Sequence, residues 1–199
     1  MRAGMGAAFI PDDFFRPYGV AEIFGRGEEC EVDLGCGDGG FLLAMAEHYP
    51  DRLFLGVERL LGRIRKVCAE SEKRGLANVR GLRVESRYFL EWMVKPGSIR
   101  RLHYLFPDPW PKEKHHKNRL VQETFVPVLH RALAPEGELL FKTDHKDYYD
   151  WVCERFDNSP LFRRVEWDEA YYPKTDFQTL WESQGKEVYS AKYIRNDEL

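Results

Sequence analysis

The chain has 199 residues, of which 43% are hydrophobic, 14% aromatic and 32% charged, and its net charge is −3 at pH 7. These values exclude a disordered chain and predict about one globular domain whose core needs no disulfides. The four cysteines form no CxxC pair, and no apolar run is long enough for a signal peptide or a membrane span. We therefore expect reduced thiols in a cytoplasmic protein without membrane contact.

The first 28 residues show no regular pattern, so we predict an irregular N-terminal arm over residues 1–28 and a single domain over 29–199. Four apolar side chains of the arm are expected to anchor it on the core. They are Phe9, Ile10, Phe14 and Phe15.

A strand, a glycine turn and a helix follow one another after the arm. They are predicted at Cys30–Leu34, Gly35–Gly40 and Phe41–Glu47. Such a turn lets the backbone approach a ligand at the helix N-terminus, as in nucleotide-binding α/β folds. A second strand, Leu53–Val57, ends at Glu58, where these folds bind a ribose diol. Together these features predict a cofactor that contains adenosine.

The glycine spacing fits GxGxxG (35, 37, 40) and GxGxG (35, 37, 39) equally, so NAD and S-adenosylmethionine both remain open at this point. Asp33, two residues before Gly35, favours S-adenosylmethionine. Its carboxylate suits a ligand with an ammonium and a sulfonium group and would repel a pyrophosphate. The alternative is that Asp33 only caps the loop.

The next elements continue the alternation of strands and helices. An amphipathic helix is predicted at Leu60–Arg74, and a third strand at Asn78–Val84 ends at Glu85 and Ser86, a polar pair placed to read an adenine edge. A fourth strand, Arg101–Phe106, delivers the chain into a proline-rich segment.

The C-terminal part completes the pattern of an α/β fold with a doubly wound, mostly parallel sheet. Its predicted elements are a helix at Asn118–Leu133 bent or restarted at Pro127, a strand at Glu138–Thr143, a helix at Tyr148–Phe156, a strand at Leu161–Val165, a short helix at Thr175–Ser183 and a strand at Glu187–Ile194. Ligands bind at the carboxyl ends of such strands. We therefore expect the acids at the strand ends to share one crevice: Asp33, Glu58, Glu85, Asp108 and Asp144.

The segment FPDPWPKEKHHKNR, residues 106–119, combines stiffness with charge. Prolines at 107, 109 and 111 are expected to hold Asp108 and Trp110 on a rigid extended backbone. Residues 100–119 carry six Lys/Arg against two acids, whereas residues 135–199 carry nine against fifteen. This distribution favours a localised contact with a polyanion. The alternative is a surface turn followed by solvated charges.

The chain resembles the tRNA (guanine-N7)-methyltransferases of the bacterial single-chain type over roughly residues 31–193. The motifs that carry the resemblance are VDLGCGDGGFL, FLGVE, NVRGLRVES, LFPDPWPKEKHHKNRL, FKTD and TDFQTLWESQGKEVY. The resemblance implies a Rossmann-like class I fold with a seven-stranded sheet and helices on both faces. It also implies methyl transfer from S-adenosylmethionine to N7 of the variable-loop guanosine at position 46 of tRNA. S-adenosylhomocysteine is then the product, no metal takes part, and the enzyme is a monomer or homodimer.

The resemblance also assigns roles to individual residues. Asp108 is the expected catalytic residue, accepting hydrogen bonds from guanine and stabilising the charge that develops on the ring. The cofactor site would contain Asp33, Gly35, Gly37, Glu58, Glu85, Ser86 and Asp108. The substrate nucleotide would meet Lys112, Asp144 and the segment from Thr175 to Gln178. The tRNA phosphates would meet Lys114, His115, His116, Lys117 and Arg119.

The sequence departs from the family pattern at two places. Glu85-Ser86 stands where Asp-Ala is usual, and Gln178 replaces a glutamate. Three alternatives have different chemistry: an amino-methyltransferase of the Asn/Asp-Pro-Pro-aromatic type, a non-catalytic RNA-binding module and a nicotinamide dehydrogenase.

Overall fold

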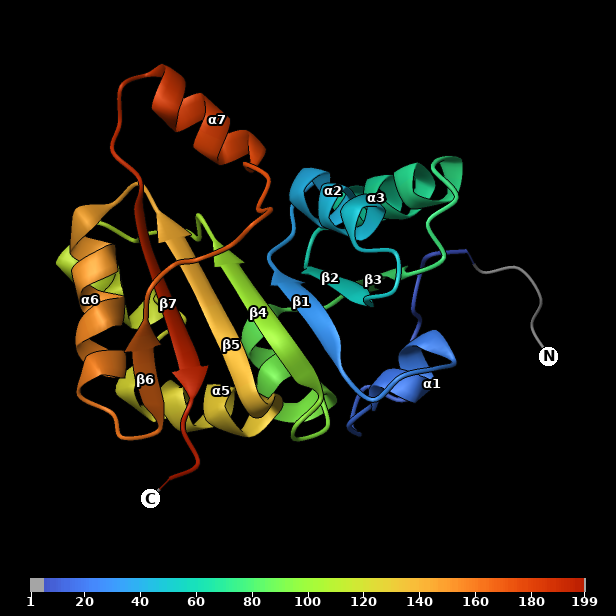
Figure 1. Cartoon of the computed structure of the whole chain (residues 1–199), viewed down its shortest axis with the longest axis horizontal. Helices are drawn as coiled ribbons and strands as arrows, with labels where there is room; N and C mark the ends of the chain where they lie inside the picture. The colour runs from blue at the N-terminus through green and yellow to red at the C-terminus, as the bar shows by residue number, and fades with distance from the viewer. Residues whose placement is uncertain (1–5, 199) are drawn as a thin grey trace.

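Seven strands form one sheet in the computed structural model, which describes residues 6–198. The strands are β1 (Cys30–Leu34), β2 (Phe54–Glu58), β3 (Val79–Arg83), β4 (Ile99–Leu105), β5 (Leu133–Thr143), β6 (Phe162–Val165) and β7 (Tyr189–Arg195). Their order is β3-β2-β1-β4-β5-β7-β6, and β7 is antiparallel to both of its neighbours (Figure 1). The predicted mostly parallel, doubly wound sheet is therefore confirmed.

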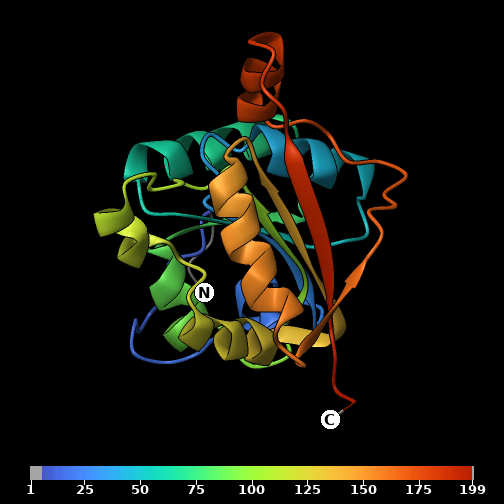
Figure 2. The same cartoon turned by 90° about the vertical axis from the view of Figure 1, so that its left-hand side faces the viewer.

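Helices cover both faces of this sheet. They are α1 (Val20–Phe24), α2 (Gly40–His48), α3 (Leu61–Lys73), α4 (Ser86–Tyr88), α5 (Val126–Ala132), α6 (Lys146–Asp157) and α7 (Asp176–Ser183), with a π-helical turn η1 (Phe89–Met93) and two 3₁₀ turns, η2 (Glu113–Asn118) and η3 (Glu123–Phe125). Figures 1 and 2 show α2 and α6 on opposite faces and α7 standing above the strand ends. No helix among residues 6–198 has the length and apolarity needed to cross a membrane.

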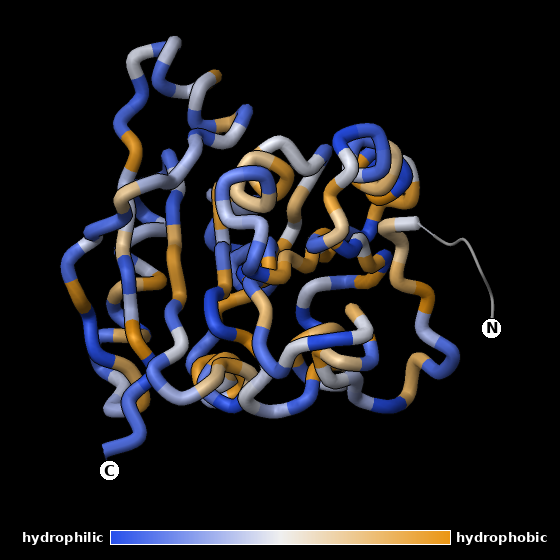
Figure 3. The backbone as a smooth tube through the Cα atoms, turned by 45° about the vertical axis from the view of Figure 1, so that its right-hand side comes forward, coloured by the Kyte–Doolittle hydropathy of each residue, from blue (hydrophilic) through white to orange (hydrophobic). Residues whose placement is uncertain are grey.

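The core is divided into two apolar layers by the sheet. Phe41, Leu42 and Met45 of α2 pack with Phe54 and Leu105 on one face. The larger layer on the other face joins α1, α5 and α6 to the strands. Strands buried on both faces are usually rich in apolar residues. The apolar residues of β1 are interrupted by Glu31 and Asp33, and Figure 3 shows blue and orange stretches alternating along the backbone. Carboxylates at the ends of such strands are therefore candidates for ligand binding.

The predicted helix over residues 118–133 is wrong in its first half. The chain is extended at Arg119, and α5 starts only at Val126, directly before Pro127. Proline fits the first turn of a helix but not its interior, so Pro127 marks a start rather than a bend. β5 begins at Leu133, earlier than predicted, because Leu133 pairs with Ile99 of β4. The helical turns between Ser86 and Met93 were not expected.

The arm is more ordered than the sequence suggested and docks differently. It contains α1, and single bridges join Ala8 to Gly81 and Tyr18 to Val94. Phe9 packs against the core as expected. The other three expected anchors are wrong, because the exposed fractions are 61% for Ile10, 44% for Phe14 and 90% for Phe15. The first five residues of the arm lie outside the described part, and the division into arm and domain stays a prediction.

Candidate active site

The glycine loop closes the carboxyl ends of β1 and β2 into a cradle. The backbone N–H groups of Gly35 and Cys36 donate to the carbonyl of Val57, at 2.8 and 3.1 Å. Gly35 has φ +82° and Gly37 has φ +57°, which favour glycine over any side chain. A Cβ atom at Gly35 would meet nothing within 4 Å. The loop therefore leaves open space where a ligand can approach its backbone.

Asp33 is a buried carboxylate next to this loop. Its exposed fraction is 4%, and within residues 6–198 its side chain makes no hydrogen bond or ion pair. Burial, together with the nearby charge of Glu58, raises the pKa of Asp33 to about 7. An uncompensated buried carboxylate is costly, and a cationic ligand group would remove that cost. Asp33 and the glycine loop thus fit the ammonium group of S-adenosylmethionine.

Glu58 ends β2 beside Asp33 and is also buried. One of its oxygens accepts the N–H of Leu60 at 2.9 Å. The other lies 3.6 Å from a guanidinium nitrogen of Arg63. This second oxygen is held only by a long ion pair, so the carboxylate retains acceptor capacity for a diol. The geometry is compatible with the ribose contact expected from the sequence.

Glu85 serves as the N-cap of α4. Its carboxylate accepts the backbone N–H groups of Arg87 and Tyr88 at 3.0 and 2.9 Å, which is the usual role of an acidic cap. Glu85 is exposed and Ser86 half-buried. The pair lies at the end of β3 as predicted, but the carboxylate is already engaged with backbone donors.

The proline segment leaves β4 through two residues with positive φ. Phe106 has φ +48° and Trp110 has φ +45°, and the N–H of Phe106 donates to the carbonyl of Lys142 on β5 at 2.8 Å. The expected extended backbone is therefore wrong at Trp110, since this conformation is strained for a bulky residue. Asp108 lies between the two bends and is exposed. The segment presents its carboxylate to solvent at the carboxyl end of β4.

Arg119 holds this segment from inside the protein. Its side chain is 0% exposed, its Nε donates to the carbonyl of Pro109 at 2.9 Å, and Nη2 forms an ion pair with Asp147 of α6. The guanidinium carbon lies 5.0 and 4.9 Å from the rings of Tyr148 and Trp151. The expectation that Arg119 contacts tRNA phosphates is thus wrong, because its donors point into the fold and cannot reach RNA.

The remaining basic residues of the segment lie on η2 or, for Lys112, directly before it. Lys112, Lys114 and Lys117 are exposed, and no ion pair involves them within the described part of the chain. His115 and His116 are half-buried, and His116 lies 3.9 Å from Asp147. Between residues 6 and 198, no three His, Cys, Asp or Glu side chains are grouped so as to hold a metal ion. The three lysines are therefore free to meet an anion.

Helix α7 stands above the carboxyl ends of the strands (Figure 1). Thr175 caps it by accepting the N–H of Gln178 at 3.0 Å. Gln178 is buried: its Oε1 accepts Lys142 Nζ at 3.3 Å, and its Nε2 donates to Glu182 at 2.8 Å. The polar groups expected to meet the substrate at Thr175 and Gln178 are therefore used to fix α7.

Asp144, which follows β5, accepts a hydrogen bond from Lys186 at 3.0 Å, so it too is tied to the segment after α7. The β5 end and α7 form one connected wall.

The strand order places these residues along one edge. Asp33 is in register with His103 of β4, and Leu105 of β4 is in register with Lys142 of β5. The sheet reverses its direction of growth between β1 and β4, the point where ligands bind in doubly wound sheets. Glu58, Asp33, Asp108 and Asp144 thus stand at the carboxyl ends of four consecutive strands.

Two residues near this edge were missed in the sequence. Tyr172 forms a hydrogen bond with His103 at 2.8 Å, and burial with the nearby charge of Asp33 raises the pKa of its hydroxyl. Lys142 Nζ lies 4.8 Å from the Tyr172 ring and 4.9 Å from that of Trp167, and burial lowers its pKa. No local pattern marks Tyr172, because its segment has no regular structure, whereas Lys142 lies on β5 within the FKTD motif and was passed over there.

Comparisons of the sequence with known proteins identify methyltransferases as relatives. The sequence model of a family described as putative methyltransferases matches residues 28–191. A tRNA (guanine-N(7)-)-methyltransferase of Leifsonia xyli subsp. xyli is 37% identical over 177 residues, which are 86% of this chain and 78% of the relative. One of Chromohalobacter salexigens is 36% identical over 170 residues, 83% of this chain and 69% of that one.

Solved structures share the fold at low identity. The 16S rRNA methyltransferase KamB has a TM-score of 0.63 at 16% identity, over 88% of this chain and 91% of that one. A SAM-dependent methyltransferase from Aquifex aeolicus has a TM-score of 0.59 at 13% identity, over 84% and 82%. The solved structures support only the fold, whereas the sequence matches identify the family. The chain belongs to the tRNA (guanine-N7)-methyltransferase family.

Proposed function

We propose that this protein transfers a methyl group from S-adenosylmethionine to N7 of the guanosine at position 46 in the variable loop of tRNA. The observation that carries the proposal is the pairing of two different carboxylates at adjacent strand ends. Asp33 is buried beside the glycine loop with no side-chain partner among residues 6–198, and Asp108 is exposed on the proline segment. One suits a cationic cofactor and the other a polar base.

The cofactor would lie along the ends of β1 and β2. Asp33 would accept from its ammonium group, Gly35 and Gly37 would let it approach the backbone, and Glu58 would accept from its ribose hydroxyls. Glu85 and Ser86 would flank the adenine. When bound, S-adenosylmethionine supplies an electrophilic methyl group on a sulfonium centre.

Guanine N7 carries an in-plane lone pair and no proton at neutral pH, so no base is needed to expose the nucleophile. A bond forms between N7 and the methyl carbon as the sulfur–methyl bond breaks, and the positive charge moves from sulfur to the guanine ring. The protein mainly has to align N7 with the methyl group. Positioning of this kind can supply roughly 7–11 kcal/mol.

Asp108 would align the base. Its carboxylate accepts from guanine N1–H and the exocyclic amine, a donor pair that adenine does not offer, and it stabilises the cationic ring of the product. The clamp from Arg119 to the Pro109 carbonyl fixes the backbone next to Asp108. We therefore assign Asp108 as orienting and electrostatic residue rather than as a proton acceptor.

The RNA would be bound by the exposed lysines of the proline segment. Lys114 and Lys117, with His115 and His116, would contact phosphates, and Lys112 would reach the substrate nucleotide. Asp144 and the segment from Thr175 to Gln178 would form the opposite wall. Because Thr175 and Gln178 are engaged within α7, they would act through the position of that helix.

The direct test is incubation of the protein with S-adenosylmethionine and unmodified tRNA, followed by chemical cleavage at N7-methylguanosine. We expect one cleavage, at position 46. Methylation of an exocyclic amine, or no transfer despite cofactor binding measured by calorimetry, would contradict the proposal.

We further propose that the protein acts in the cytoplasm, that residues 29–199 form one methyltransferase domain and that no metal takes part. The affinity for S-adenosylmethionine should then be unchanged after treatment with EDTA. Sedimentation should give a monomer or a homodimer.

A further inference from the structure

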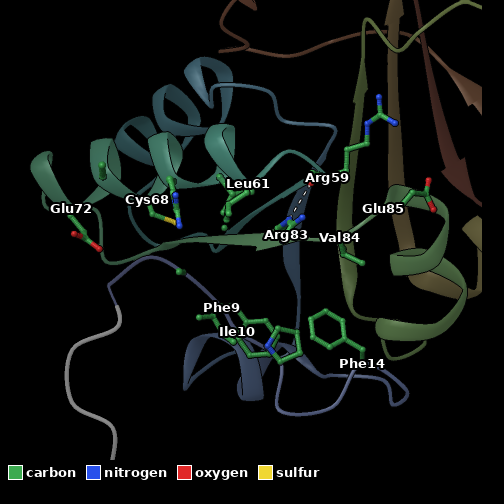
Figure 4. Close-up of a pocket in the computed structure, with 16 residues that line it drawn as sticks. Phe9, Ile10, Phe14, Arg59, Leu61, Cys68, Glu72, Arg83, Val84 and Glu85 are labelled. Carbon is green, nitrogen blue, oxygen red and sulfur yellow. Dashed lines mark hydrogen bonds between the residues drawn. The ribbon is translucent and has the colours of Figure 1, made fainter.

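A hollow of about 830 Å³ lies away from the glycine loop, at the outer edge of β3. Residues of the arm and of α3 line it from opposite sides (Figure 4). Its walls are largely apolar and include Phe9, Ile10, Phe14, Leu61 and Ile64. None of Asp33, Gly35, Gly37 and Glu58 lines it, and Glu85 is the one residue of the expected cofactor site that does. We call this cavity the α3 hollow, and the expected cofactor site leaves the rest of its walls unexplained.

Three exposed arginines stand around the α3 hollow: Arg59, Arg65 and Arg83. None forms an ion pair within residues 6–198, and the one side-chain hydrogen bond among them runs from Arg83 to the Arg59 carbonyl at 3.3 Å. The neighbouring Arg63, by contrast, is paired with Glu58 and Asp38. The three guanidinium groups at the hollow are therefore available to an anion.

The two acids of the α3 hollow are already engaged. Glu85 accepts two backbone N–H groups as the cap of α4. Glu72 accepts the N–H of Ala7 at 3.3 Å, and in Figure 4 it lies at the end of the hollow opposite Glu85. These hydrogen bonds leave both carboxylates charged, but the three arginines outnumber the two acids, so the lining of the hollow carries a net positive charge.

The position of the α3 hollow links it to the candidate active site. Arg59 directly follows Glu58, and Arg83 is the last residue of β3, so both lie at the carboxyl edge that also carries Asp33 and Asp108. A polyanion that lies along this edge can contact the lysines of the proline segment and the three arginines together. The substrate of the proposed function is such a polyanion.

We propose that the α3 hollow is a second tRNA-binding site, which takes one nucleotide of the bound tRNA. The base packs against Phe14 and the apolar wall, and the flanking phosphates contact Arg59, Arg65 and Arg83. Aromatic side chains combined with arginines suit a nucleotide, since every base has a face for stacking and every phosphate a charge. The proposal rests on the proposed function for the identity of the RNA.

The first test measures binding of unmodified tRNA over a range of salt concentrations, for the wild type and for a variant with Arg59→Gln, Arg65→Gln and Arg83→Gln. Each lost phosphate contact lowers the slope of log Kd against log salt by about 1. Arg26→Gln, at an exposed position far from this edge, is the matched control and should leave the slope unchanged. Calorimetry with S-adenosylmethionine runs in parallel and should give an unaltered Kd.

The second test compares two neighbouring phenylalanines. Phe14 lines the α3 hollow and Phe15, which is more exposed, does not. Phe14→Ala should weaken tRNA binding about tenfold, as expected for loss of one stacked base, whereas Phe15→Ala should have no effect.

Three results would overturn the proposal. One is an unchanged salt slope in the arginine variant, and another is equal behaviour of the two phenylalanine variants. The third is an effect confined to the affinity for S-adenosylmethionine or to the oligomeric state, which would assign the hollow to the cofactor or to a second copy of the chain. Binding is measured without turnover, so failure of methyl transfer in the wild type would count against the proposed function alone.

Discussion

The two halves of the candidate active site are built in different ways. In the cofactor half, the glycine loop and Asp33 are fixed by the backbone of β1 and β2, with hydrogen bonds to Val57 and burial in the sheet. In the substrate half, the proline segment and α7 are held by side-chain contacts, and Arg119 joins the segment to Asp147 of α6. Arg119 fixes Pro109, and Gln178 is fixed by Lys142.

This difference separates what each half can tolerate. A site fixed by backbone hydrogen bonds survives most side-chain changes nearby and depends on the one carboxylate that meets the ligand. A site held by side-chain clamps can lose its geometry through a residue that never touches the substrate. Changes in the two halves should therefore separate cleanly into effects on cofactor affinity and effects on turnover.

The largest effect is expected for Asp108→Asn, which keeps the shape of the side chain but removes its charge. We expect kcat to fall about 100-fold, as for loss of an electrostatic stabiliser, and the Kd for S-adenosylmethionine to rise by a smaller factor, because Asp108 also belongs to the expected cofactor site. Steady-state kinetics with unmodified tRNA and calorimetry provide the two numbers. A variant that loses activity only in one pH range while still selecting guanine would show that Asp108 is a proton acceptor instead.

Arg119→Ala tests the clamp. It removes the bond to the Pro109 carbonyl that holds the strained backbone at Trp110. We expect kcat to fall about tenfold and the free energy of unfolding to drop by about 2–3 kcal/mol. The Kd for S-adenosylmethionine and the salt slope of tRNA binding should stay constant, since the side chain reaches neither.

Two controls accompany this variant. Added guanidinium ion at millimolar concentration should restore part of kcat by filling the space left by the side chain. Asp147→Asn keeps the Pro109 contact and should have the smaller effect. A lower salt slope of tRNA binding in Arg119→Ala would instead show that Arg119 contacts tRNA phosphates.

The pH dependence of cofactor binding tests the role of Asp33 in the cofactor half. The pKa of Asp33, about 7, lies above its ordinary 3.8, so the carboxyl is largely protonated in the free protein at pH 6. Binding of the ammonium group requires the ionised form. The affinity for S-adenosylmethionine should therefore fall about tenfold between pH 8 and pH 6, as measured by calorimetry.

The same shift affects folding. Because the pKa of Asp33 is raised in the folded state, its protonated carboxyl contributes its whole share of the free energy of unfolding below about pH 4. That contribution is lost as the pH rises toward 7. Without ligand, the Asp33→Asn variant should consequently have a higher melting temperature than the wild type at pH 8. The difference between the two melting temperatures should shrink as the pH falls. A pH profile of affinity identical in both proteins would rule out Asp33 as the titrating group.

The smallest effect concerns the lysines of the proline segment. Lys114→Ala and Lys117→Ala should each lower the salt slope of tRNA binding by about 1 and weaken binding to all tRNAs alike. Arg26→Ala serves as the control. An unchanged slope would mean that these side chains are only solvated surface.

The strands and the glycine turn that form the cofactor half could be predicted from the sequence almost completely. The strand at Cys30–Leu34, the glycine turn and the acids Asp33 and Glu58 form a local pattern in which each residue constrains its neighbours. Apolar runs give the strands, glycines give the loop, and a polar residue at a strand end indicates a ligand. The parallel order of the sheet then follows from the alternation of strands and helices.

The substrate half could be predicted only in part. The grouping of the lysines and Asp108 on one segment could be predicted because they are close in sequence, and their roles stay a prediction. The burial of Arg119 was missed because it depends on Asp147, Tyr148 and Trp151 of α6, and no local signal distinguishes it from its exposed neighbours. The exposure of Phe14 was missed for a related reason, since apolar character alone does not determine whether a side chain reaches the core.

A crystal structure of the protein with S-adenosylhomocysteine would test the central claim most directly. The account predicts that the ligand's ammonium group lies within hydrogen-bond distance of the Asp33 carboxylate, its ribose hydroxyls at Glu58 and its sulfur facing Asp108 across the crevice between β1 and β4. A ligand bound elsewhere, such as in the α3 hollow with Asp33 still unpartnered, would contradict it.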